Sequence, residues 1–136
     1  MHSSRASQGR QRKGPTVMAG AFDFASLRAA YRDGGSTPRD VVRTAYARIR
    51  ADARPGLWIS LRAEDEALAL AELLEQQGPD TLPLYGLPFS VKDNIDVAGL
   101  ETTAACPAYA YRPDRSGRVV AALEAKGAIC LGKTNL

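Results

Sequence analysis

The stretch from Ser116 to Thr134 places a helical pattern directly before an apolar strand, and this order constrains the fold more than any other feature of the sequence. Ser116 is the expected N-cap of the helix, Val120 lies on its apolar face, and Gly127 ends it. The run "AICLGKT" that follows is typical of a buried strand. A second strand-like run, "FSV" at residues 89–91, precedes this helix. Strand, helix and strand in this order predict an α/β domain.

The first half of the chain carries three further helical patterns and one short strand. The predicted helices span residues 23–33, 38–50 and 64–77, and the predicted strand, "LWISL", spans 57–61. The second helix has a clear start signal, because Thr37 can act as N-cap and Pro38 suits the first helical position. We expect the apolar stripes of these elements, Leu70 included, to form the core.

The end of the chain matches the spelling of a phosphate-binding loop, GxxxxGK[ST], at Gly127, Gly132, Lys133 and Thr134. A true phosphate loop follows a strand, exposes backbone N–H groups and leads into a helix. Here the first glycine follows a helix, and the four residues between the glycines are an apolar strand. The match is therefore interpreted as a helix end followed by a strand, which argues against nucleotide binding.

Charge is unevenly distributed along the 136 residues, whose formal net charge is +3. Residues 1–17 hold four basic side chains and no acid, so the rest of the chain has 14 basic and 15 acidic residues. We expect residues 1–20 to be a disordered basic tail, or Met18 to be the true start, and residues 21–136 to form the folded part. This balance predicts no nucleic-acid surface, and no apolar run approaches a membrane span, so a soluble cytoplasmic protein is expected.

The histidine and cysteine content limits the chemistry. The only histidine is His2, in the tail, which excludes a Ser-His pair, a Cys-His pair or a histidine zinc site in the body. Proton transfer there must use lysine, tyrosine, cysteine or a carboxylate. Cys106 and Cys130 have apolar neighbours and no metal-ligand spacing, and both are predicted to be buried reduced thiols.

Residues 82–136 carry a series of motifs whose order and spacing resemble the opening of the amidase signature family. The motifs are Gly86-Leu87-Pro88, Val91-Lys92-Asp93-Asn94, Asp96-Val97-Ala98-Gly99, Thr102-Thr103 and Gly132-Lys133-Thr134-Asn135. Within the family, "TTAACPAYAY" and the earlier "WISL" resemble the allophanate hydrolase subfamily. The resemblance implies an α/β amidase-signature fold, a mixed sheet flanked by helices, of which this chain holds only the N-terminal part.

The family resemblance also implies a catalytic triad of a nucleophilic serine, a second serine in a cis peptide, and the lysine of "VKDN", which is Lys92 here. Only a neutral amine can accept a proton from a serine hydroxyl, and desolvation favours that form. The apolar strand before Lys92 is expected to carry it into an interior. Asp93 would oppose this role as a close anion, unless strand alternation turns it to the opposite face.

Other polar residues near Lys92 are given structural interpretations. Ser90 shares its strand face, but the family nucleophile lies elsewhere. Lys133 is interpreted as structural, and Asp96 as a turn residue that hydrogen-bonds its own backbone. Both family serines belong to a Gly/Ser-rich stretch that this sequence lacks, so the 136-residue chain alone is expected to be inactive.

The resemblance implies that the full enzyme hydrolyses the terminal amide of allophanate with release of ammonia and needs no metal or organic cofactor. It implies a functional link to a biotin-dependent urea carboxylase, the missing C-terminal part of the same enzyme as a partner, and a homodimer as the full-length form. Two alternatives stay open. One is another amidase-family enzyme, either a general amidase or the amidase-family subunit of a tRNA-dependent amidotransferase, and the other is a non-catalytic scaffold.

Overall fold

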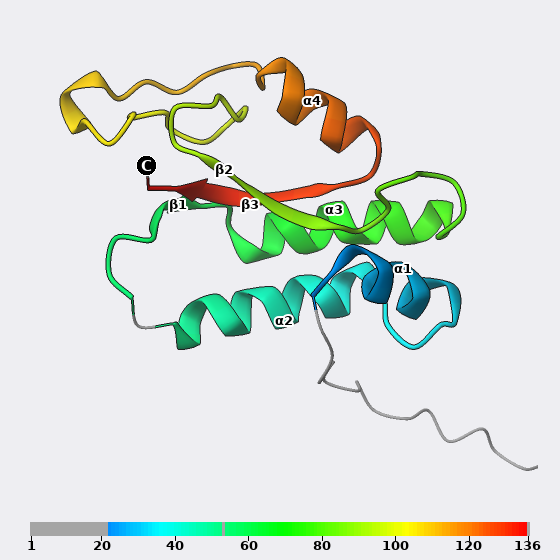
Figure 1. Ribbon diagram of the computed structural model, residues 1–136. Coiled ribbons are helices and arrows are strands. Elements are labelled where there is room, and N and C mark those ends of the chain that lie inside the picture. Colours follow the sequence, from blue (N-terminus) through cyan, green and yellow to red (C-terminus); the bar gives the residue numbers. More distant parts are fainter. Residues whose placement is uncertain (1–21, 53, 136) are drawn as a thin grey trace, which may run out of the picture.

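The computed structural model describes residues 22–52 and 54–135, so the predicted tail of residues 1–20 lies outside the described part. Figure 1 shows a small sheet between helices. The elements are α1 (Phe24–Arg32), α2 (Pro38–Ala51), β1 (Trp58–Leu61), α3 (Glu64–Gln77), β2 (Pro88–Lys92), the 3₁₀ turn η1 (Pro107–Tyr109), α4 (Arg118–Ala125) and β3 (Ile129–Thr134). This is the mixed α/β arrangement that the sequence predicts, and each predicted helix and strand is present.

The three strands form one mixed sheet in the order β1-β3-β2. β3 is the central strand, antiparallel to β1 and parallel to β2. The parallel pair is joined through α4, which returns the chain from one end of β2 to the start of β3. The strand that comes last in the sequence therefore holds the sheet together.

Gly132 explains why the end of the chain matches the sequence pattern of a phosphate loop without forming one. A Cβ at this position would lie 2.4 Å from the carbonyl oxygen of Ser60 and 3.0 Å from the Cα of Leu61, both on β1. Only glycine lets the two backbones approach this closely. The second glycine of the motif thus serves strand pairing, in agreement with the interpretation of this segment as a strand.

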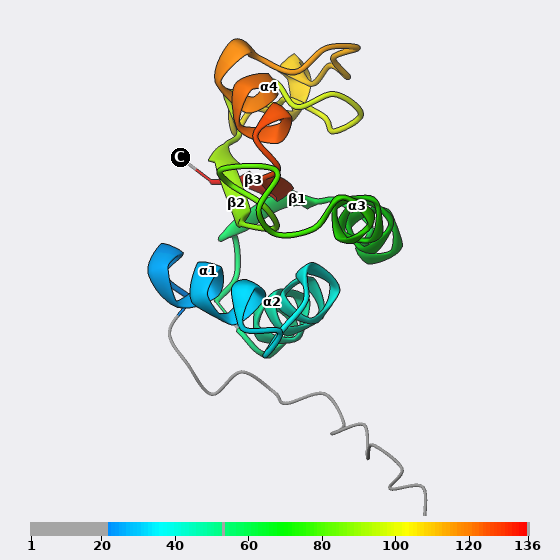
Figure 2. The same cartoon turned by 90° about the vertical axis from the view of Figure 1, so that its right-hand side faces the viewer.

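Other elements cover both faces of the sheet, with α2 and α3 on one side and α4 with the loop after β2 on the other (Figures 1 and 2). On one face, Ile129 and Leu131 of β3 pack with α2 and α3, against Tyr46 and Ala71 among others. On the opposite face, Cys130 packs with Val91, Val97, Leu100 and Val120, which come from β2, the loop after it and α4. A third cluster joins α1 and α2 to the segment before β2 through Leu27, Tyr31, Val41 and Tyr85.

The start of α2 is fixed as the sequence predicts. Thr37 accepts a hydrogen bond from the N–H of Asp40, and the Asp40 carboxylate accepts one from the N–H of Thr37. This reciprocal capping box satisfies two backbone donors that the first turn of a helix would leave unpaired. Pro38 follows at the first helical position.

Three predictions about single residues are wrong. Ser116 is not an N-cap, because α4 begins after Gly117, and the Ser116 hydroxyl instead accepts a hydrogen bond from the N–H of Ala98. Cys106 is exposed, whereas Cys130 is buried as expected, and burial raises the pKa of the Cys130 thiol. Leu70 is 36% exposed rather than internal, since it lies on the outer side of α3.

No helix in the described ranges is long and apolar enough to cross a membrane.

Candidate functional site

Lys92 is the last residue of β2, and its side chain is exposed in the described part of the chain. Burial alternates along the strand, with Ser90 and Lys92 exposed and Val91 and Asp93 buried. The expectation that β2 carries Lys92 into an interior is therefore not met by the described residues. The reason is that side chains of a strand point to the two faces of the sheet: Val91 and Asp93 take the face covered by α4 and the loop, and the described residues do not bury Lys92 on the other face.

Asp93 turns away from Lys92, as the alternation of strand faces predicts. Its side chain is fully buried, on the side of the sheet covered by α4 and the loop after β2. The N–H of Asp93 donates to the carbonyl oxygen of Thr134 at 2.9 Å, so the backbone pairing of β2 with β3 continues one residue beyond Lys92. The anion that could oppose a basic amine at Lys92 is thus directed to the opposite face.

A β-bulge brings Lys133 to the same face as Asp93. Phe89 pairs with Cys130 and Ser90 pairs with Gly132, which leaves Leu131 as an extra residue of β3. An extra residue reverses the face on which the following side chains lie. Without it, Lys133 would point toward the layer of α2 and α3. The bulge therefore redirects a lysine into the loop layer.

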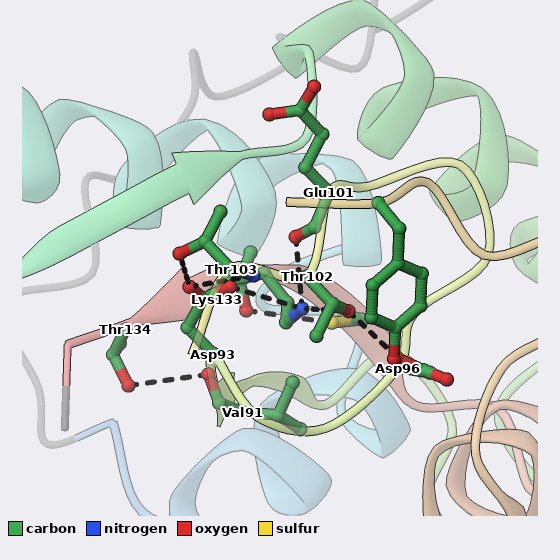
Figure 3. A network of polar contacts seen from close by, with 11 residues as sticks. Val91, Asp93, Asp96, Glu101, Thr102, Thr103, Lys133 and Thr134 are labelled. Carbon is green, nitrogen blue, oxygen red and sulfur yellow. Dashed lines mark hydrogen bonds and ion pairs between the residues drawn. The ribbon is translucent and has the colours of Figure 1, made fainter. Parts of the chain in front are cut away.

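The ammonium of Lys133 is the centre of a buried polar network (Figure 3). It donates to the carbonyl oxygen of Glu101 at 3.1 Å and to Oγ1 of Thr102 at 3.0 Å. It also lies 3.3 Å from Oδ1 of Asp93, and both side chains of this ion pair are 0% exposed. Glu101 and Thr102 therefore accept two of the three ammonium donors, and the carboxylate of Asp93 compensates the charge, although its Oδ1 accepts no hydrogen bond within the described residues.

The second carboxylate oxygen of Asp93 is held by the loop. It accepts hydrogen bonds from the N–H of Thr103, at 3.2 Å, and from the Thr103 hydroxyl. Burial raises the pKa of Asp93, but the hydrogen bonds of Thr103 and the ammonium of Lys133 outweigh it and hold this pKa below its usual value. Asp93 therefore stays ionised.

Two alanines adopt left-handed backbone angles where the loop wraps around Asp93. Ala104 has φ +49° and Ala105 has φ +61°. The N–H of Ala104 donates to the carbonyl oxygen of Asp93 at 3.3 Å. Left-handed conformations cost an L-residue about 1–2 kcal/mol, so the contacts to Asp93 must outweigh that cost.

Asp96 extends the network outward. Its Oδ1 accepts hydrogen bonds from the hydroxyls of Tyr111, at 2.6 Å, and Thr102, at 2.8 Å. These two hydrogen bonds, Tyr111 first, lower the pKa of Asp96. The expectation that Asp96 serves its own backbone in a turn is wrong, because the loop returns at Tyr111, which pairs with Thr102 through a backbone bridge.

The sequence interpretation identified Lys92 and gave Lys133 a structural role, but it did not find the partners of Lys133. Two signals were present in the sequence. Lys133 continues an apolar strand, which predicts burial, and Asp93 alternates with Lys92, which predicts the opposite face. The bulge that joins these two signals falls at Leu131, next to Gly132, and a glycine inside a strand pattern is a signal for a bulge that the sequence interpretation did not use. Ser90 lies on the exposed face of β2 with Lys92, as expected.

A depression of about 450 Å³ lies next to this network. It is lined by residues of β1, of the segment between β2 and α4, and by the residue directly after β3: Ile59, Ser60, Glu101, Thr103, Ala105, Pro107, Ala110 and Asn135. Thr103 thus contacts Asp93 with its hydroxyl and borders an open space. Within the described ranges, no group of three or more histidine, cysteine or acidic side chains could hold a metal ion.

Comparisons with known proteins agree on one family. The family model described as Amidase matches residues 40–136. Urea amidolyase of Saccharomyces cerevisiae is 52% identical over 80 residues, which are 58% of this chain and 4% of that protein. One subunit of the glutamyl-tRNA(Gln) amidotransferase of Deinococcus radiodurans is 34% identical over 120 residues, 88% of this chain and 25% of that protein.

A solved structure resembles the fold as well. The selenomethionine-substituted allophanate hydrolase of Kluyveromyces lactis superposes with a TM-score of 0.67 at 36% identity. The superposition covers 89% of this chain and 20% of that one. The chain therefore spans a quarter or less of the length of each of these proteins.

Proposed function

Since this chain belongs to the amidase signature family, we propose that it is the N-terminal part of a hydrolase that cleaves a C–N amide bond, with allophanate as its substrate. The observation that carries the proposal is the geometry at the end of β2. The side chain of Lys92 is exposed at the end of β2, and the neighbouring carboxylate of Asp93 is buried on the other face of the strand. An amine in this position is free to meet the part of the enzyme that brings the serines.

In this proposal Lys92 acts as the general base of a Ser-cisSer-Lys triad. The neutral amine takes a proton from the cis serine, which takes one from the nucleophilic serine as its oxygen attacks the amide carbon. The C–N bond then breaks, the nitrogen receives a proton and leaves as ammonia, and an acyl-enzyme ester is left. Water attacks that ester by the same proton path, which releases the carboxylate. Both serines would come from the remainder of the full-length enzyme.

The exposure of Lys92 is consistent with this role. A base needs an environment that favours its neutral form, and desolvation supplies it. Here the described residues leave the side chain of Lys92 exposed on its face of β2. The remainder of the enzyme would cover that face and desolvate the amine when it brings the serines into contact. The base would then become competent only in the assembled site.

The choice of allophanate is supported by the names of the relatives, urea amidolyase and allophanate hydrolase. It is also supported by the segment "TTAACPAYAY", which forms the loop around Asp93 and η1. Allophanate is a carboxylated urea, so a biotin-dependent urea carboxylase is the proposed functional partner that would supply it. A homodimer is the proposed form of the full-length enzyme.

The test measures ammonia release from allophanate by the full-length enzyme that contains this segment. We expect Lys92→Met to lower kcat at least 10³-fold, because removal of a triad member leaves only the other contributions to catalysis. Lys126→Met is the matched control, since Lys126 is an exposed lysine at the end of α4 and should leave kcat unchanged. Turnover that survives Lys92→Met would contradict the proposal.

A second candidate function is supported by the similarity to the glutamyl-tRNA(Gln) amidotransferase. The same full-length enzyme would then release ammonia from glutamine rather than from allophanate. Parallel assays with the two substrates separate the candidates. A third candidate, a non-catalytic scaffold, predicts that the 136-residue chain is a stable monomer that unfolds cooperatively and that no ammonia is released from either substrate.

A further inference from the structure

The proposed reaction uses Lys92 but gives no role to the buried charged side chains on the opposite face of β2. Lys133 and Asp93 form an ion pair with both side chains 0% exposed. Replacing such a pair with apolar residues is often neutral or stabilising, so a buried ion pair is weak evidence for a contribution to stability. The pair lies at the end of β2 on the face opposite to Lys92, the proposed base, and this location suggests a role in catalysis.

The backbone ties this pair to Lys92 on both sides. Val91 pairs with Lys133 and Lys92 pairs with Thr134 in the register of β2 and β3. Asp93 follows Lys92 directly and donates its N–H to the Thr134 carbonyl. The rotation of the strand about its axis at Lys92 is therefore set by whether Asp93 is held on the buried face.

The loop holds Asp93 there from a second direction. Thr103 donates from its N–H and its hydroxyl to one carboxylate oxygen, and Lys133 faces the other. Lys133 is in turn anchored to Glu101 and Thr102 of the same loop. A twist of the strand that moved Lys92 would have to break these contacts together.

We propose that Lys133, Asp93 and Thr103 are positioning residues for Lys92: their buried contacts lock the end of β2 so that the amine of Lys92 projects onto the opposite face. The inference rests on the proposed function, since it assigns these residues to the same site. The ion pair has a second effect here. Because Lys133 compensates the charge of Asp93, that carboxylate cannot act as an unpaired anion beside the base.

Thr103 provides the most direct test, because Thr103→Val keeps the shape of the side chain and removes its hydroxyl. In the full-length enzyme, we expect Thr103→Val to lower kcat about 10- to 100-fold with KM within about twofold, since a small misplacement of a catalytic group carries a cost of that size. Thr103→Ser, which keeps the hydroxyl, should recover most of that loss. Thr44→Val is the matched control, because it removes a hydroxyl bonded to the Asp40 carbonyl in α2, away from the site.

The charged pair is tested by a double-mutant cycle. Lys133→Met should lower kcat by a similar factor, because Asp93 then loses its partner, and the added Asp93→Asn change should restore part of it by removing the unpaired charge. All assays are made at least about 15 °C below the melting temperature of each variant, so that unfolded protein does not account for a lower kcat. If Lys133→Met does not fold, the Thr103 series decides alone.

The outcomes separate this inference from the function on which it rests. If Lys92→Met abolishes turnover while folded Thr103→Val and Lys133→Met keep the wild-type kcat, the network is only structural and the inference is wrong. If loss of the Thr103 hydroxyl raises KM and leaves kcat unchanged, the loop binds substrate and does not position the base, which also overturns it. If Lys92→Met is active, the proposed function itself fails.

Discussion

Two lysines of this chain differ in environment although they lie on neighbouring strands. Lys92 is exposed at the end of an edge strand, and Lys133 is completely buried in the central strand with its charge compensated. The motifs of the sequence identified the first as the candidate base. The burial of the second follows from its apolar strand, but its hydrogen-bond partners lie on a loop 31 and 32 residues away along the chain. A local pattern contains no information about that loop's path.

Asp93 should make folding stability depend on pH in the acidic range. Its folded pKa is held below the unfolded value of 3.8, so its contribution is fully present above about pH 4 and is lost as the pH falls through the folded pKa. Asp93→Asn removes that contribution. We therefore expect the difference in unfolding free energy between wild type and Asp93→Asn to be largest near neutral pH and to shrink below pH 4. Denaturant unfolding from pH 2 to pH 7 measures it, and a constant difference would contradict the assignment.

Ala104 should be one of the few places where glycine stabilises this protein. At φ +49°, alanine bears a left-handed strain that glycine does not, while glycine costs about 0.4–1 kcal/mol through the unfolded chain. Ala104→Gly is expected to raise the unfolding free energy by up to about 1 kcal/mol. The same change at Ala121, which is exposed within α4, should lower it by about 0.5–1 kcal/mol. Equal signs in urea unfolding of the two variants would refute the strain argument.

At the scale of elements, the sequence predicted what depends on short-range signals. Thr37 and Pro38 fixed the start of α2, and Gly127 ended the pattern of α4. The start of α4 was missed by one residue because Ser116 bonds to Ala98 rather than to the helix that follows it. The bulge in β3 was missed, although Gly132 inside the strand is a signal for one, because a glycine alone does not show which residue is left unpaired. The position of Lys133 in the candidate site follows from that bulge.

Gly132 should be the most sensitive glycine of the sheet. An alanine there would place its Cβ against the backbone of β1. Backbone atoms in a paired strand cannot move aside, whereas the end of a flexible side chain can. We expect Gly132→Ala to lower the unfolding free energy by about 2–3 kcal/mol, as overpacking in a core does. Gly35→Ala is the matched control, since its Cβ would meet only the Ala30 carbonyl oxygen at 3.8 Å. Thermal unfolding of both variants tests this, and a melting temperature of Gly132→Ala equal to that of the control would show that β1 can move.

At the scale of the whole molecule, the chain is a small part of what its relatives contain. The superposition on the allophanate hydrolase covers a fifth of that protein, and β2 is an edge strand of the sheet described here. The fold class was predictable from the order of elements, and the family from the spacing of its motifs. The assembled site was not, because the triad that we propose includes serines that lie outside this sequence. Lys92 as the base therefore stays a prediction, tested by its methionine variant.

The central place of β3 bears on how the protein is made. Within the part of the chain that the structure describes, β1 and β2 are not paired with each other, and each pairs with Ile129–Thr134. While the ribosome is still synthesising α4, both strands have been synthesised, but β3, with which each of them pairs here, has not. The helices can form early from local contacts, whereas these strand pairings must wait until β3 has emerged from the exit tunnel. A pause in translation before that point would leave two unpaired strands open to chaperones or to other nascent chains.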